Sequence, residues 1–140
     1  MPAPRIPLGV PLMDEDHARI EALIADIPAM PDDELAAFGV RLRLELAEHF
    51  AAEEDLMKEH GAPVLECHVA QHRMLLSEVE AGVERAGDDA AALRRHLGRD
   101  VPALVLAHVA SVDQMTARFL GGGLDADAVA GLRLPIGSAA

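Results

Sequence analysis

Histidines and acids at helical spacing are the residues of this sequence best suited to chemistry. His49 and Glu53 are four residues apart, and so are His68 and His72. Residues i and i+4 lie about 40° apart around a helix, so each pair can direct two donor atoms at one point. Imidazole and carboxylate together suit iron, zinc, copper or manganese better than calcium or magnesium. The spacing therefore predicts metal chelation from the side of a helix.

The histidines also recur on stripes that helical periodicity otherwise fills with aliphatic residues. Five of the seven lie at interior positions, namely His17, His49, His68, His72 and His108. His60 falls at a helix end and His96 off its stripe. One buried imidazole is usually a hydrogen-bonded core residue, but several without partners cost roughly 1–3 kcal/mol each. A shared cation removes that cost, and two cations that share a carboxylate would account for five nitrogens.

These side chains must be positioned by helices, because the apolar residues recur at alternating steps of three and four. The stripes predict helical segments over residues 14–28, 32–61, 63–87 and 89–119. Gly61 and Gly87 are expected to end the second and third segments. Pro102 lacks an amide hydrogen and its ring crowds the preceding turn, which predicts a kink there or a restart near Arg99.

Short connections between four such helices favour an all-α protein, an up-down-up-down antiparallel four-helix bundle. The bundle is expected over residues 14–120, with Asp14 capping its first helix. Residues 1–13 carry four prolines and are interpreted as an extended N-terminal arm. Residues 121–140 are interpreted as a C-terminal tail.

Composition narrows the partners and the compartment. With 51% hydrophobic and 2% aromatic residues, the chain can build one aliphatic core. A formal charge of −12 repels nucleic acid and anionic membrane surfaces, so neither is expected as a partner. The sequence shows no signal segment and no apolar run of about 20 residues, which favours a cytoplasmic protein. The single cysteine, Cys67, excludes an intrachain disulfide and is interpreted as a packing thiol, with redox sensing as the alternative.

Taken in order, these motifs resemble the hemerythrin family, in particular the single-domain bacterial hemerythrins. The matching stretches are MDEDHARI, HFAAEEDLM, GAPVLECHVAQH and HVASVD, which span nearly the whole expected bundle. The resemblance implies a non-heme di-iron centre with carboxylate bridges and an oxo or hydroxo bridge. It also implies reversible binding of dioxygen, as hydroperoxide, at the iron that keeps an open position.

The resemblance assigns the iron ligands residue by residue. One iron would be bound by His68, His72 and His108 and the other by His17 and His49, with Glu53 and Asp113 bridging both. Asp113 comes from the resemblance alone, because a residue five positions after His108 lies about 140° around an ideal helix. A local distortion of the helix is therefore required. The acids Glu54 and Asp55 are interpreted as solvated.

The resemblance also implies an apolar oxygen pocket. By position, its lining would be Ile20, Leu104, Val105 and Val109, all aliphatic residues that are equally compatible with a plain core. Leu104 stands where the family often has Trp, and this smaller side chain would loosen the pocket.

The leading hypothesis is a dioxygen-binding protein, not an enzyme, that serves storage, delivery or sensing. The alternative is an enzyme that acts on peroxide, oxygen or nitric oxide, although the expected pocket offers only aliphatic side chains to such chemistry. A zinc or purely structural metal site and a metal-free interaction bundle also stay open. A sensing role would need a separate protein partner, since 140 residues leave no room for an output domain.

Overall fold

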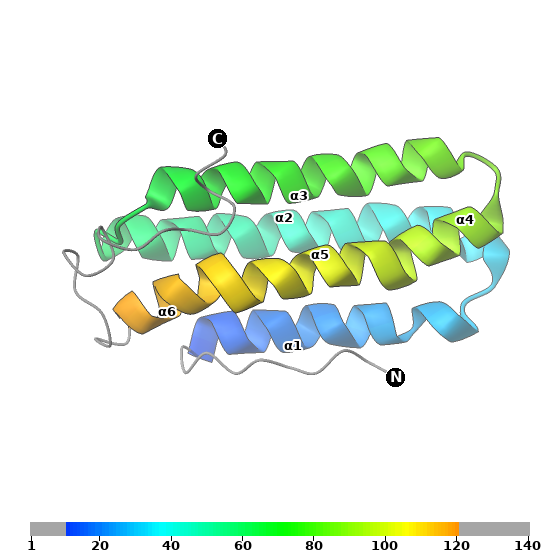
Figure 1. Ribbon diagram of the computed structural model, residues 1–140. Helices are drawn as coiled ribbons and strands as arrows, with labels where there is room; N and C mark the ends of the chain where they lie inside the picture. Colours follow the sequence, from blue (N-terminus) through cyan, green and yellow to red (C-terminus); the bar gives the residue numbers. More distant parts are fainter. Residues whose placement is uncertain (1–10, 121–140) are drawn as a thin grey trace.

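Four helical rods form the part of the chain that this computed structural model describes, residues 11–120 (Figure 1). The first three rods are α1 (Pro11–Ala25), α2 (Leu35–Glu59) and α3 (Leu65–Ala86). The fourth rod is built end to end from α4 (Ala90–Arg95), η3 (His96–Asp100), α5 (Val101–His108), η4 (Val109–Asp113) and α6 (Gln114–Leu120). Two short 3₁₀ turns, η1 (Ile27–Ala29) and η2 (Asp32–Glu34), join α1 to α2. Because the described residues contain no strand, the predicted all-α bundle is confirmed.

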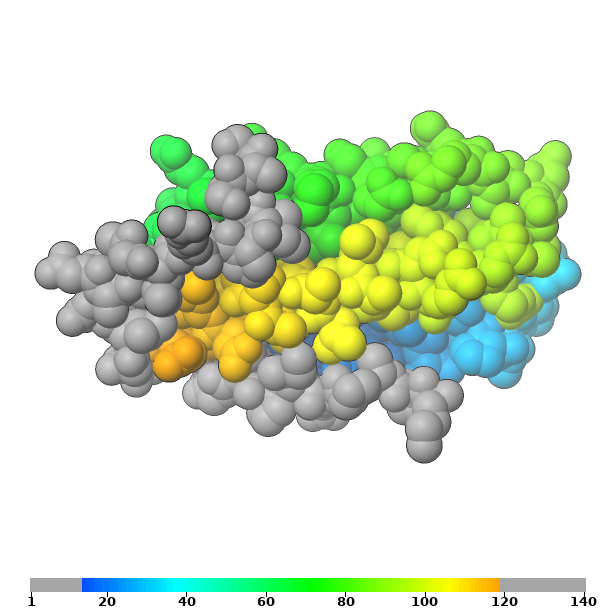
Figure 2. Space-filling view, in the orientation of Figure 1, coloured from blue at the N-terminus to red at the C-terminus, as the bar shows by residue number. Residues whose placement is uncertain are grey.

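The rods pack side by side, and the chain reverses direction at each connection in Figure 1. The fourth rod lies between α3 and α1 on the face shown in Figure 2, and α2 lies behind it in Figure 1. Arg43 of α2 forms an ion pair with Glu80 of α3. Arg94 of α4 donates hydrogen bonds to the carbonyl oxygens of Ile27 and Met30, at 2.6 and 2.8 Å. The guanidinium thereby fastens the start of the fourth rod to the α1–α2 connection.

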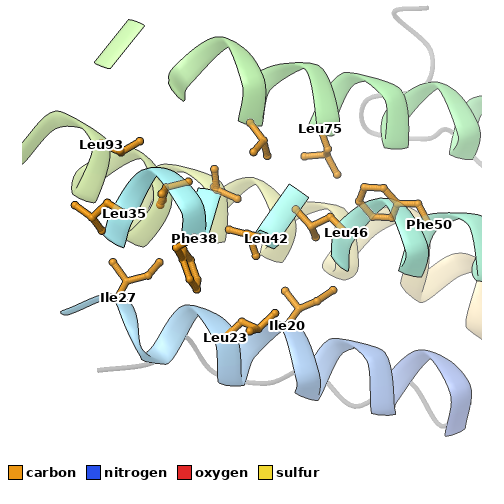
Figure 3. Close-up of a cluster of buried hydrophobic side chains, with 13 residues drawn as sticks. Ile20, Leu23, Ile27, Leu35, Phe38, Leu42, Leu46, Phe50, Leu75 and Leu93 are labelled. Atoms are coloured by element: carbon orange, nitrogen blue, oxygen red, sulfur yellow. The ribbon is translucent and has the colours of Figure 1, made fainter. Parts of the chain in front are cut away.

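A core of mostly aliphatic side chains, with Phe38 and Phe50, fills the bundle between these rods (Figure 3). Its largest fully buried side chains include Ile20 and Ile27 from the α1 side and Leu42 and Leu46 from α2. Leu97 of η3 closes the core from the fourth rod and is 0% exposed. All five are aliphatic, as the composition predicts. None of the helices among residues 11–120 is both long enough and apolar enough to cross a membrane.

Several helix ends differ from the prediction. Helix α1 ends at Ala25, and α2 begins at Leu35 after the 3₁₀ turn Asp32–Glu34, whereas the sequence predicted residues 28 and 32 for these ends. Helix α1 begins at Pro11, so residues 11–13 are helical and Asp14 lies in the first turn instead of capping it. Helix α3 begins at Leu65, two residues after Pro63. The proposed arm otherwise falls on residues 1–10, and the tail on 121–140, both outside the described residues.

The predicted stops at Gly61 and Gly87 are confirmed, because both glycines adopt positive φ angles, of 61° and 52°. Between α2 and α3, Val64 also lies in the left-handed region, with φ of 56°. This conformation costs a β-branched residue roughly 1–2 kcal/mol. The Val64 carbonyl accepts a hydrogen bond from the amide of His68 at 3.1 Å, so the turn sets where the first histidine of α3 lies.

The fourth rod leaves α-helical geometry twice, in the π-helical segments η3 and η4. The first, His96–Asp100, ends two residues before Pro102 and covers Arg99, so the predicted interruption is confirmed. Helix α5 then restarts with Pro102 in its first turn, where a missing amide hydrogen is tolerated. Such π turns are rare and concentrate at functional sites. The second π turn bears directly on the predicted ligands.

Candidate metal centre

All four rods contribute histidine or carboxylate side chains to one buried cluster. Helix α1 supplies His17, α2 supplies His49 and Glu53, α3 supplies His68 and His72, α5 supplies His108, and η4 supplies Asp113. These seven residues are the complete set expected from the sequence. Each is 6% exposed or less. The structure therefore brings together every residue expected to bind metal.

Donor atoms of the cluster form two overlapping groups. In each group, one nitrogen or oxygen atom per residue lies within 4.8 Å of all the others. The larger group is Glu53, His68, His72, His108 and Asp113, and the smaller is His17, His49, Glu53 and Asp113. The two carboxylates belong to both groups. This division matches the expected arrangement of two ions with shared carboxylates.

Glu53 lies between the two groups of histidines. Its Oε1 atom is 2.6 Å from Nε2 of His68 and 3.2 Å from Nε2 of His72. Its Oε2 atom is 3.2 Å from Nε2 of His49 on the other side. Neither oxygen has a partner with hydrogen-bond geometry, and the same is true of His49 Nε2. These buried atoms point toward shared space more than toward one another, which is the orientation of donors around a cation.

Asp113 also reaches both groups. Its Oδ1 atom is 2.7 Å from His68 Nε2 and 2.8 Å from His108 Nε2, while Oδ2 is 3.1 Å from His17 Nε2. The π turn Val109–Asp113 explains how it does so. An i to i+5 turn returns residues five apart to nearly the same side of the helix, so Asp113 aligns with His108. The local distortion that the resemblance required is present.

The outward nitrogens of the imidazoles are held by a second layer of side chains. Four Nδ1 atoms lie within hydrogen-bond distance of Asp16 (from His49, 3.0 Å), Thr116 (from His68, 2.9 Å), Glu54 (from His72, 2.7 Å) and Gln71 (from His108, 2.9 Å). The carboxylate and amide oxygens among these can only accept, so they place the proton on Nδ1 and leave the Nε2 lone pair facing inward. The His72 ring is also stacked on Phe50, with centroids 4.0 Å apart. These contacts orient the rings with Nε2 toward the centre of the cluster, as metal binding would require.

Charge in the cluster is unbalanced unless cations or protons are present. Burial disfavours ionisation of Glu53, but contacts with three histidines outweigh it and lower the pKa of this carboxyl to about 2. Burial likewise opposes ionisation of Asp113, yet His108 and the other histidines around it hold its pKa well below the usual value. Burial lowers the pKa of His68, whereas its contacts with Asp113 and Glu53 raise it, with a net rise to about 9. The two carboxylates therefore stay ionised and draw positive charge to the interior.

The donor set fits a transition metal. His72 Nε2 and His108 Nε2 are 3.1 Å apart, so two inward lone pairs would repel without a positive charge beside them. Burial lowers the pKa of His108, which makes a proton a poor source of that charge. A bound cation would satisfy both nitrogens together with the unpaired Glu53 oxygens. Imidazole and carboxylate donors favour iron, zinc, copper or manganese among such cations.

Two residues were misassigned from sequence. Glu54 was interpreted as a solvated acid, but its side chain is 21% exposed and its Oε2 lies 2.7 Å from His72 Nδ1. His96 was placed off the core stripe, but it is 5% exposed and its Nε2 donates to the Val79 carbonyl at 3.0 Å. The surroundings of both residues are set by helix α3. It brings His72 to Glu54, and its Gly82 leaves the space that the His96 ring occupies.

Asp16, Gln71 and Thr116 were missed altogether. A weak signal existed for Gln71, which is a lone polar residue on the interior stripe of α3 between two histidines. Thr116 follows Asp113 by three residues, so it lies on the same side of the helix one turn later. No comparable signal marks Asp16, because its contact with His49 crosses from α1 to α2.

These features define a helical bundle with a buried histidine–carboxylate centre suited to metal cations. The model of the hemerythrin HHE cation binding domain matches residues 8–120, and the chain belongs to this family. The resemblance noted in the sequence is thereby confirmed. No curated protein and no solved structure matches the chain significantly.

Proposed function

We propose that this protein binds two iron ions in the bundle and binds dioxygen reversibly at them, for storage, delivery or sensing. The observation that carries the proposal is the cluster itself, in which five inward imidazoles surround two shared carboxylates. One iron would be held by His68, His72 and His108, and the other by His17 and His49, with Glu53 and Asp113 holding both. Two irons would together supply the electrons for reversible reduction of dioxygen.

The unequal number of histidines supports a small-molecule site on one side. The group around His17 and His49 offers two imidazoles, whereas the group around His68 offers three. Since Glu53 and Asp113 serve both groups, the two-histidine side has one donor fewer. An ion there keeps a position for an external ligand, as catalytic and ligand-binding metal sites generally do.

Aliphatic side chains would keep water and anions away from that position. Ile20 lies one turn after His17 on α1 and is 1% exposed, and Val109 directly follows His108 and is 6% exposed. Leu104 and Val105 are half-buried and pack against the core cluster. A dry lining admits an apolar gas and disfavours charged ligands, because the lining cannot solvate them. These four residues are the proposed oxygen pocket.

The proposed function implies a cellular compartment and a set of binding partners. We expect the protein to act in the cytoplasm with dioxygen as its ligand and without nucleic acid or membrane. Its charge of −12 supports the last two expectations. For a sensing role we also propose a protein partner.

Iron counting and absorption spectroscopy on the same sample test the proposal. We expect close to two irons per chain and a visible charge-transfer band that appears with oxygen and fades when oxygen is removed. Glu53→Ala should lose the paired centre, whereas Asp55→Ala, at an exposed position two residues away, should keep it. A colourless protein without iron after expression in iron-rich medium would contradict the proposal. Rapid turnover of peroxide in place of reversible binding would favour the enzymatic alternative.

A further inference from the structure

Helix α2 carries a second apolar stripe that faces away from the core. Among the side chains of residues 14–118, the large apolar ones that are most exposed are Val40 at 62%, Leu44 at 54% and Met74 at 49%. Two of them, Val40 and Leu44, are four residues apart on α2. With three alanines they repeat at steps of three and four and make up the outer stripe of α2: Ala37, Val40, Leu44, Ala47 and Ala51.

The outer stripe lies on the opposite side of α2 from the metal centre and the core. Each residue advances about 100° around a helix, so Leu44 is about 160° from the buried Leu42 and Leu46. In Figure 1 this side of α2 is turned away from the viewer, behind the fourth rod. No helix among the described residues covers it, as the exposure of Val40 and Leu44 shows. A continuous apolar stripe on a surface helix is the usual contact face for another helix.

Two opposite charges flank the outer stripe on the same side. Arg41 and Glu48 are seven residues apart, which is two helical turns, and both are exposed. Neither forms an ion pair within the described part of the chain, although Arg43 on the other flank is paired with Glu80. If two α2 helices pack antiparallel about a two-fold axis, Arg41 of each copy lies beside Glu48 of the other. The stripe is therefore complementary in charge to itself.

We propose that the outer stripe of α2 binds the same stripe of a second copy of this chain, in antiparallel orientation. The register that pairs Arg41 with Glu48 brings the two Leu44 side chains together beside the two-fold axis, so the largest side chains of the stripe meet at the centre of the contact. One helix face buries less than the roughly 1,000 Å² of a stable interface, so the dimer is weak and reversible. Two chains of charge −12 also repel, which further limits its strength.

Sedimentation equilibrium of the full-length, metal-loaded chain tests this pairing. At about 0.15 M salt the Debye length is about 8 Å, so distant charges are screened while contact pairs persist. The wild type should self-associate as its concentration rises to about 1 mM. Leu44→Glu should abolish association. Arg41→Glu and Glu48→Arg should each weaken it about tenfold or more, because each sets like charges against one another twice.

Mixing the two charge-reversal variants gives the sharpest outcome. In an equimolar mixture every acid of the Arg41→Glu chain meets an arginine of the Glu48→Arg chain, so association should return to about the wild-type level. Arg99→Glu is a matched control for Arg41→Glu, since it makes the same change in net charge at a 71% exposed position on the fourth rod. Circular dichroism and iron content should be equal in all variants.

Two results would overturn the proposal. One is a wild type that stays monomeric at about 1 mM, which would mean that another segment covers the stripe or that it stays bare. The other is a mixture of the two variants that associates no better than either alone, which would exclude the antiparallel register.

Discussion

Replacing Glu54 tests whether the outer layer of side chains supports the metal centre. Glu54 accepts from His72 Nδ1 at 2.7 Å, and His72 is 1% exposed. Glu54→Ala removes the acceptor and leaves a buried N–H without its partner. Glu54→Gln keeps an oxygen at that position but removes the negative charge. Asp55→Ala is the matched control, because Asp55 is the adjacent acid and is exposed.

The expected loss follows from two effects. Removing an outer-shell partner of a histidine ligand generally weakens metal binding by about 10- to 100-fold. Leaving a buried donor unsatisfied costs roughly 1–3 kcal/mol, which is the same range. Glu54 is 21% exposed, so water can replace part of its carboxylate. We therefore expect about tenfold weaker binding for Glu54→Ala, a smaller loss for Glu54→Gln and no change for Asp55→Ala.

Anaerobic competition of the metal-free protein with a chelator of known affinity for iron(II) measures these differences. The titration resolves both affinity and stoichiometry, so loss of one ion can be told from weaker binding of two. The reasoning would be refuted if Glu54→Ala bound iron as tightly as Asp55→Ala. Equal losses in Glu54→Gln and Glu54→Ala would show instead that the charge, not the hydrogen bond, carries the effect.

Two further predictions concern stability, each measured by urea unfolding. A Cβ on Gly82 would lie 1.9–2.3 Å from atoms of the His96 ring, so Gly82→Ala should destabilise the fold by about 1–3 kcal/mol. Gly39→Ala, whose Cβ meets neighbours at 3.5 Å, should be neutral or stabilising, and equal effects would contradict this distinction. The pKa of His68 is raised from 6.5 to about 9, mainly by hydrogen bonds that outweigh burial. The metal-free protein should therefore keep this stability below pH 6.5 and lose roughly 3 kcal/mol as pH rises through 9, a loss that His68→Gln should remove.

Much of the centre could be predicted because helical periodicity is local. Once His17, His49, His68, His72 and His108 were seen on interior stripes, their convergence followed from packing four stripes together. The i, i+4 spacing also predicted that His49 with Glu53, and His68 with His72, direct their donor atoms to the same place. Neither inference requires knowledge of how distant segments meet in detail.

The remaining residues depend on geometry that spacing does not encode. Asp113 is aligned by a π turn, and ideal α-helical spacing points it elsewhere. Glu54 lies beside the interior stripe of α2 and becomes a partner only because α3 brings His72 to it. His96 enters the interior in the other π turn, into space left by Gly82. Each exception depends on a contact between helices, and for Asp113 and His96 a π turn contributes as well.

The side chains that contact the outward Nδ1 atoms are unevenly distributed between the two groups of histidines. The group with fewer such partners is the one proposed to keep an open coordination position. All three histidines of the larger group have a side-chain partner at Nδ1, from Thr116, Glu54 and Gln71. In the smaller group His49 has such a partner, whereas Nδ1 of His17 is buried with no hydrogen-bond partner among the described residues. An imidazole held at one end only is oriented less firmly and is the weaker ligand. The smaller group thus has fewer donors and one histidine without an Nδ1 partner. In the larger group, each of the three histidines has an Nδ1 partner. If two irons bind as proposed, the ligand-binding iron would need room to change its coordination and its neighbour would need to stay fixed, so the second layer would divide these two roles between the groups.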